Sequence, residues 1–229
     1  MIPLKDNVVL RRPAVATLAL VGLNALAFVW QVSSGAPGEP VALRIQWSAL
    51  VGGAIPYEIA TWRDIGPRDL VPPPFTILTS MFLHGGVLHL AGNMLFLWVF
   101  GPAVEDAIGR ARFVGFYLAS GVAAAIAQTL LSFAAGDPFI PMVGASGAIA
   151  GVLAAYVVLF PWARVLTVVP IFVFIRFMHL PAGFFIGLWF VLQVVNAVLG
   201  GGGSGVAFFA HVGGFVFGWL VTKVLASRR

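Results

Sequence analysis

Ser146 and His211 are the side chains of this sequence best suited to nucleophilic chemistry, and both stand in apolar surroundings. Ser146 lies in Gly144-Ala145-Ser146-Gly147 at the start of one apolar run, and His211 lies near the start of the last one. A polar side chain within a membrane-spanning segment costs free energy, so it is a functional candidate. A serine becomes a nucleophile when a base takes its proton, and histidine is the usual base. The pair predicts a hydrolase that works inside the bilayer.

The composition requires a membrane protein. Of the 229 residues, 60% are hydrophobic and only 9% are charged, and the mean hydropathy is +1.01. A soluble domain carries about 25% charged residues. The net charge of +5 does not indicate a nucleic-acid partner, because the basic residues stand singly at the ends of apolar segments. Cysteine is absent, which excludes disulfides and thiolate metal sites.

Continuous apolar runs predict an all-α, polytopic fold with six transmembrane helices. A crossing needs about 20 apolar residues, and the second and fourth runs are short by that measure. The runs are continuous rather than alternating, which favours helices over a barrel. The expected spans are 14–32, 86–101, 113–135, 146–160, 182–199 and 206–225.

The basic residues predict the orientation. Of the 13 lysines and arginines, ten lie on the side that holds both termini, and Arg44, Arg63 and Arg68 lie opposite. Cytoplasmic loops collect basic residues, so we expect a multi-pass protein of the cytoplasmic membrane with both termini inside. Residues 1–12 would form a cytoplasmic tail, and residues 13–229 a membrane domain.

Two connections between the expected spans are unusual. Residues 33–79 form a long outer loop whose apolar stretches suggest a segment partly submerged in the membrane interface. Residues 163–181 are apolar but broken by Arg164, Pro170, Arg176 and His179, so we expect them at the cytoplasmic surface. A seventh crossing is the alternative for this second segment.

The polar residues of three expected helices lie at one depth. At about 1.5 Å per residue, Ser146, His211, His89 and Asn93 lie roughly 18 to 24 Å above the cytoplasmic border. Ser146 would open its helix, where the free amide groups can stabilise an oxyanion. His89 and Asn93 are four residues apart and share one helix face, so both can donate to that oxyanion. The alternative is that these two side chains only hold their helix to its neighbours.

Small residues four positions apart should bring the serine and histidine helices together. Gly147 and Gly151 lie on the first helix, and Gly214 and Gly218 lie on the second. Such spacing lets membrane helices pack backbone to backbone. The direct role of these glycines, and of Gly144 beside them, is packing, with catalysis as its consequence.

No carboxylate is placed to complete a triad, since all eight acids are expected in loops or at helix ends. A Ser-His dyad follows, with the imidazole oriented by packing or by water and therefore a weaker base. Glu105, near the cytoplasmic border, is expected to tie down a loop. Without a His-Glu-x-x-His pair or a buried acid, no metal is expected. His84 is expected at the outer interface, with a local structural or gating role as the alternative.

These motifs together resemble the rhomboid family of intramembrane serine proteases. The resemblance rests on Gly144-Ala145-Ser146-Gly147, on His89-x-x-x-Asn93 with the preceding His84, on Gly101-x-x-x-Glu105-x-x-x-Gly109, and on Ala210-His211-x-Gly213-Gly214 followed by Gly218. It extends from about Phe75 to the C-terminus. The chain departs from the family pattern at Phe75-Thr76, where some members carry Trp-Arg, and at Ala150, where an aromatic residue often packs on the catalytic histidine.

The resemblance implies that Ser146 is the nucleophile and His211 the general base. It implies an oxyanion hole formed by the Ser146 amide, His89 and Asn93. The implied activity is cleavage of single-span membrane proteins in or near their transmembrane segment, without a cofactor. The implied partners are these transmembrane substrates and the lipid bilayer. A catalytically inactive membrane scaffold and a small transporter are the alternatives.

Overall fold

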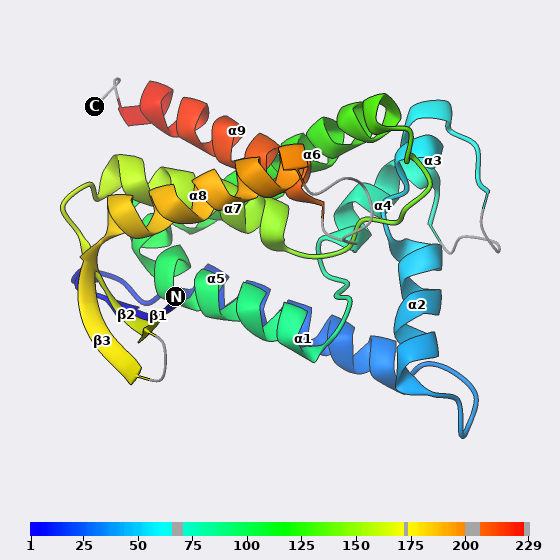
Figure 1. Cartoon of the computed structure of the whole chain (residues 1–229), viewed down its shortest axis with the longest axis horizontal. Helices are drawn as coiled ribbons and strands as arrows, with labels where there is room; N and C mark the ends of the chain where they lie inside the picture. The colour runs from blue at the N-terminus through cyan, green and yellow to red at the C-terminus, as the bar shows by residue number, and fades with distance from the viewer. Residues whose placement is uncertain (66–70, 172–173, 200–206, 227–229) are drawn as a thin grey trace.

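The chain folds into a bundle of helices with a small sheet at one end (Figure 1). The structure, a computed structural model, describes residues 1–65, 71–171, 174–199 and 207–226. The longer helices of the bundle are α1 (Val15–Ser33), α5 (Val87–Ile108), α6 (Arg110–Ala135), α7 (Ser146–Leu159), α8 (Ala182–Leu199) and α9 (Phe208–Ala226).

The polytopic helical fold is confirmed. Within the described residues, five helices are long and apolar enough to cross a membrane, namely α1, α5, α6, α8 and α9. The remaining expected span, the fourth along the chain, is α7, which has only 14 residues. Its N-terminus at Ser146 and the whole of α8 agree with the expected boundaries. The second span is longer than expected, because α5 continues through Pro102 to Ile108.

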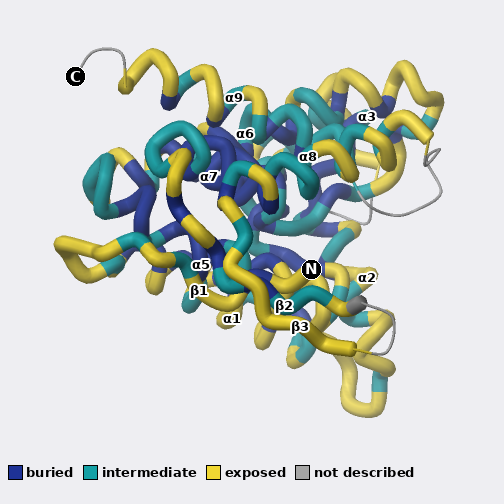
Figure 2. Tube along the Cα trace, turned by 60° about the vertical axis from the view of Figure 1, so that its left-hand side comes forward, coloured by how far each residue is buried: buried dark blue, intermediate teal, exposed yellow. Residues whose placement is uncertain are grey.

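Helix α7 is the centre of the bundle. It packs against α5, α6, α8 and α9, and ten of its 14 residues are buried. In Figure 2 the residues around α7 are mostly buried, in dark blue, while the outer helices carry exposed stretches, in yellow. An apolar helix surrounded by other helices need not match the thickness of the lipid. This explains why α7 can be shorter than its neighbours.

The long connection after α1 contains three further helices, α2 (Val41–Gly52), α3 (Pro56–Thr61) and α4 (Pro73–Ser80). Figure 1 shows α2 running across the direction of α1 and α5 at one end of the bundle. Val41, Leu43 and Trp47 of α2 are exposed. Such a surface fits the interfacial position expected for this segment, which remains a prediction. Arg68 lies outside the described residues.

A three-stranded antiparallel sheet stands where the sequence suggested a surface segment. Strands β2 (Arg164–Ile171) and β3 (Phe174–Pro181) pair with each other, and β1 (Ile2–Asp6) pairs with the other edge of β2. The segment 163–181 is therefore not a seventh membrane helix. Part of the expected N-terminal tail is the strand β1. Pro170 lies beyond Val168, where the pairing of β2 with β1 ends, so the β1 side of β2 is an open edge at this proline.

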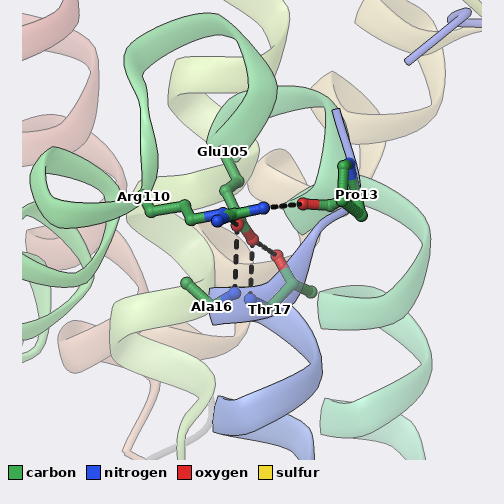
Figure 3. A network of polar contacts seen from close by, with 5 residues as sticks. All are labelled: Pro13, Ala16, Thr17, Glu105 and Arg110. Carbon is green, nitrogen blue, oxygen red and sulfur yellow. Dashed lines mark hydrogen bonds and ion pairs between the residues drawn. The ribbon is translucent and has the colours of Figure 1, made fainter. Parts of the chain in front are cut away.

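Glu105 fastens the start of α1 to α5. Its carboxylate accepts hydrogen bonds from the Ala16 amide at 2.9 Å, the Thr17 amide at 2.7 Å and the Thr17 hydroxyl at 2.8 Å (Figure 3). Arg110 lies 3.8 Å from the same carboxylate. A carboxylate at a helix N-terminus satisfies amides that have no partner within the helix. The packing role expected for Glu105 is present, but it acts on a helix start rather than on a loop.

Candidate active site

Ser146 is half-buried at the N-terminus of α7, the most buried helix. It is the first residue of α7, and the preceding Ala145 makes no side-chain capping bond. The first amides of a helix have no acceptor within it, so those of α7 point to the space beside Ser146. The loop that precedes Ser146 is held by backbone hydrogen bonds. Met142 and Ala54 each donate an amide to the carbonyl of the other, and the Gly144 amide donates to the Ser80 carbonyl at 2.8 Å.

The structure brings Ser146 and His211 together. His211 Nε2 lies 2.7 Å from Ser146 Oγ, although the two residues are 65 positions apart. His211 stands in the first turn of α9 and is 9% exposed. A separation of about 2.6 to 3.2 Å is what proton transfer from a serine to a histidine requires. The pair can therefore generate a nucleophilic oxygen.

Glycines allow α7 and α9 to approach this closely. A Cβ added to Gly214 would overlap the backbone carbonyl of Gly147, and a Cβ added to Gly218 would overlap the backbone of Gly151. Gly151 in turn faces the Ser120 side chain of α6. The two helices thus touch through their backbones at two levels. This is the packing that the spacing of the glycines predicted.

His89 and Asn93 lie beside the loop that leads into Ser146. A Cβ built on Gly144 would stand 2.9 Å from His89 Nε2 and 3.7 Å from Asn93 Nδ2. The Gly85 amide donates to His89 Nδ1 at 3.3 Å, so Nε2 carries the proton and can donate. Asn93 is buried, and its Nδ2 donates to the His89 carbonyl at 3.1 Å. Both side chains thus present donors near the start of α7.

A small cavity of about 40 Å³ opens beside Ser146. Its lining includes Ser80 and Ser146 together with apolar residues of α6. A cavity that is lined by polar groups and has a volume above about 15 Å³ can hold a water molecule. The cavity therefore provides room for the water molecule that hydrolysis requires.

Comparison with known proteins identifies the family of the chain. The Rhomboid domain family matches residues 73–228, which is most of the chain and includes every candidate site residue. The chain belongs to the rhomboid family.

Relatives of this rhomboid occur in eukaryotes and bacteria. "Rhomboid protein 1, mitochondrial" of Saccharomyces cerevisiae is 31% identical over 171 residues, covering 71% of this chain and 46% of the yeast protein. "Presenilin-associated rhomboid-like protein, mitochondrial" of Rattus norvegicus is 33% identical over 151 residues, or 64% of this chain and 37% of the rat protein. "Rhomboid protease GluP" of Bacillus subtilis is 47% identical over 79 residues, or 34% of this chain and 14% of the bacterial protein. The chain thus spans less than half the length of these relatives.

His84 differs from its sequence expectation in this rhomboid. It is fully buried rather than exposed at the interface. Its amide donates to Gln31 Oε1 at 2.8 Å, and Gln31 Nε2 donates to the His84 carbonyl at 3.2 Å. Its ring contacts that of His89 edge-on, with centroids 5.2 Å apart. His84 thus joins α1 to the segment before α5 and supports the His89 ring.

Sequence reasoning missed the partner of the His211 imidazole. Gln193 of α8 places its Oε1 2.7 Å from His211 Nδ1. The imidazole is therefore oriented by a side-chain amide, in place of the packing or water expected from the absence of a carboxylate. A glutamine within an apolar run was a usable signal, since polar side chains in membrane segments are costly.

Aromatic rings that pack near the His211 imidazole come from α8 and α9 rather than from α7. Trp189 of α8 has its ring centroid 5.8 Å from that of His211, and Phe208 lies at 6.3 Å. Ala150, where many family members carry an aromatic residue, is fully buried. Rings from α8 and α9 thus stand beside the imidazole despite the alanine.

Proposed function

We propose that this rhomboid is an intramembrane serine endopeptidase that cleaves single-span membrane proteins in or near their transmembrane segment. The observation that supports this most strongly is the 2.7 Å separation of Ser146 Oγ and His211 Nε2 beside a free helix N-terminus. Family membership and the name of the Bacillus subtilis relative agree with a protease. The substrates are transmembrane proteins met within the lipid bilayer, and no cofactor is needed.

In the proposed reaction, Ser146 Oγ bonds to the carbonyl carbon of the scissile peptide while His211 Nε2 takes the hydroxyl proton. The carbonyl oxygen becomes an oxyanion. Next, the carbon–nitrogen bond breaks and His211 gives its proton to the leaving amine. Water then attacks the acyl-enzyme in the same way, which restores Ser146 and releases the new carboxylate.

The oxyanion would be held by the Ser146 amide together with His89 and Asn93. The amide lies at the positive end of the α7 dipole, and the two side chains present protonated nitrogens beside Gly144. Preorganised donors of this kind are usually a large part of catalysis in acyl transfer. This assignment gives the α5 residues a chemical role in addition to packing.

We further propose the cytoplasmic membrane as the location, with both termini inside. The support is the distribution of basic residues, since the expected topology puts ten of the 13 on the side of the termini. The yeast and rat relatives carry "mitochondrial" in their names, so a mitochondrial inner membrane is the alternative to test. Fusing a reporter that is active on only one side of a membrane to either terminus would establish the orientation.

An inactive scaffold and a small transporter are the competing functions. A scaffold would not require a serine and a histidine within hydrogen-bond distance, and both are present. A transporter that binds cations would be expected to have an acidic side chain in the site, and the polar side chains described at this site include none. Neither alternative is favoured by a specific observation.

The test is labelling of the lipid-reconstituted protein with a fluorophosphonate. We expect labelling of the wild type and none of Ser146→Ala. His211→Ala should abolish both labelling and cleavage of a model substrate with a destabilised transmembrane helix. Absence of labelling in a folded wild-type sample would reject the enzyme, and unchanged turnover in His211→Ala would reject the dyad.

A further inference from the structure

We infer that Gln193 is the positioning residue of the His211 base, so that Ser146, His211 and Gln193 form one chain of hydrogen bonds. This inference rests on the proposed function. The amide is oriented by two bonds: Gln193 Oε1 lies 2.7 Å from His211 Nδ1, and Gln193 Nε2 donates to the Trp189 carbonyl at 3.4 Å. Because the nitrogen faces its own helix, the oxygen faces the imidazole.

An amide oxygen can only accept a hydrogen bond, so the proton of neutral His211 sits on Nδ1. The lone pair of Nε2 is then directed at Ser146 Oγ, 2.7 Å away. This is the tautomer that a general base needs. An amide differs from the carboxylate of other serine proteases because it fixes this tautomer without adding a charge, which suits an apolar surrounding.

Helix α8 must be docked for this bond to exist. Gln193 and Trp189 lie on α8, whereas His211 lies on α9, and the Phe190 and Phe215 rings stack across the two helices at 4.2 Å. Separation of α8 from α9 would therefore remove the acceptor from Nδ1. The imidazole is oriented only while the two helices are packed together.

The test compares Gln193→Leu and Gln193→Glu by the rate at which a fluorophosphonate labels Ser146 across a range of pH. Loss of one orienting hydrogen bond should slow labelling about tenfold in the leucine variant. The glutamate variant keeps an acceptor and should label faster than the leucine variant. Its pH profile should move to higher pH, because a carboxylate favours the imidazolium. The titratable side chain of His89 also interacts with His211, and it is unchanged in both variants.

Asn196→Leu is the matched control, since Asn196 is an exposed polar residue on the same helix. It should label at the wild-type rate. Equal rates and equal pH profiles for wild type, leucine and glutamate variants would overturn the positioning role while leaving the proposed protease intact. Failure of the wild type to label would instead reject the protease itself.

An independent observation concerns the sheet. We propose that β3 inserts into the headgroup layer of an anionic membrane leaflet on the side of the termini. Phe174, Ile175 and Phe177 are 65%, 67% and 66% exposed, and the nearby Trp162 is 85% exposed. Figure 2 shows β3 exposed along its length, on a strand where both faces carry apolar side chains. Contiguous apolar exposure of this kind marks a contact surface.

The charge around β3 selects the lipid. Lys5, Arg164 and Arg176 lie on the three strands and are exposed, and the chain carries no Asp or Glu after Asp137. The nearby acids are turned inward: Asp6 accepts from the Tyr156 hydroxyl at 2.7 Å, and Asp106 accepts from the Arg11 amide at 2.9 Å. Exposed cations beside aromatic rings complement anionic headgroups.

The position of the sheet agrees with insertion of β3 into the lipid headgroup layer. Strand β3 ends at Pro181, and the next residue, Ala182, begins the membrane helix α8. Figure 1 shows the hairpin extending away from the bundle beside the ends of α7 and α8. The strand therefore leaves the bundle at the level where the spanning helices end, which is the level of the lipid headgroups.

Because the protein has no cysteine, one spin label can be placed on β3 by Phe177→Cys. In nanodiscs that contain phosphatidylglycerol, we expect the label to be more accessible to oxygen than to a water-soluble nickel chelate. Leu26→Cys on α1 and Pro37→Cys in the outer connection are the lipid and water references. Arg176→Gln in the labelled protein should move the label toward the water reference.

A label at position 177 with the accessibility of the Pro37 reference would overturn the insertion. Equal depth in phosphatidylcholine alone would overturn the preference for anionic lipid. Dipolar broadening between labels would instead show that a second copy covers β3, and would equally reject the proposal.

Discussion

Ser146 and His211 meet because Gly214 packs directly on the backbone of Gly147. Gly147 follows the serine by one residue, and Gly214 follows the histidine by three, which is nearly one turn. A close backbone contact between α7 and α9 thus lies within one turn of the 2.7 Å bond between Oγ and Nε2.

Gly214→Ala should therefore abolish labelling of Ser146 by a fluorophosphonate and lower the melting temperature. The added methyl group would overlap the Gly147 carbonyl and push α7 and α9 apart. Gly115→Ala on α6 is the control, since a Cβ there meets nothing within 4 Å. Normal labelling of the Gly214 variant would show that the helices tolerate a wider spacing.

Asn93→Ala should lower kcat by about 100- to 1,000-fold, the usual effect of removing an oxyanion donor. The melting temperature should change little, because the hydrogen bond that Asn93 Nδ2 donates goes to a carbonyl of its own helix. Cleavage of a model substrate and thermal unfolding are the two measurements. A large fall in melting temperature with a modest fall in kcat would favour the structural role of Asn93.

Glu105→Ala should lower the free energy of unfolding by about 3 kcal/mol. It leaves the Ala16 and Thr17 amides without their acceptor, and hydrogen bonds to a charged group are worth roughly 1.5 to 3 kcal/mol each. Glu105→Gln should lose less, since its amide retains one accepting oxygen. Thermal unfolding in lipid measures both. Equal stability of wild type and the alanine variant would contradict the role of Glu105 as a cap for α1.

Stability should fall as the pH is lowered from about 6.5 to 4. Burial, reinforced by the neighbouring His89, lowers the pKa of His84 from 6.5 to about 4. Between these values the unfolded chain binds a proton that the folded protein does not, so acid favours unfolding. His84→Gln should show a shallower loss of melting temperature over this range. The exposed His179→Gln is the control, and an unchanged slope in the His84 variant would contradict the prediction.

Much of the fold followed from local sequence. Hydropathy placed α8 at residues 182–199 and the start of α7 at Ser146, because the bilayer demands long apolar runs and their ends are marked by polar or turn-forming residues. Glycines four apart indicated which helices would touch, and the polar residues within apolar runs marked the site. Each of these signals is contained in one segment of chain.

The remaining features depend on contacts between segments. Strands β2 and β3 formed where β1, more than 150 residues earlier, supplies a further partner strand. A short apolar run is ambiguous between helix and strand until that partner is known. Gln193 became the partner of His211 because α8 packs on α9 with its Gln193 face toward the imidazole. The sequence by itself determined which residues are apolar, small or reactive. Only the tertiary structure decided which of them meet, since a hydrogen bond of 2.7 Å depends on packing that no single helix contains.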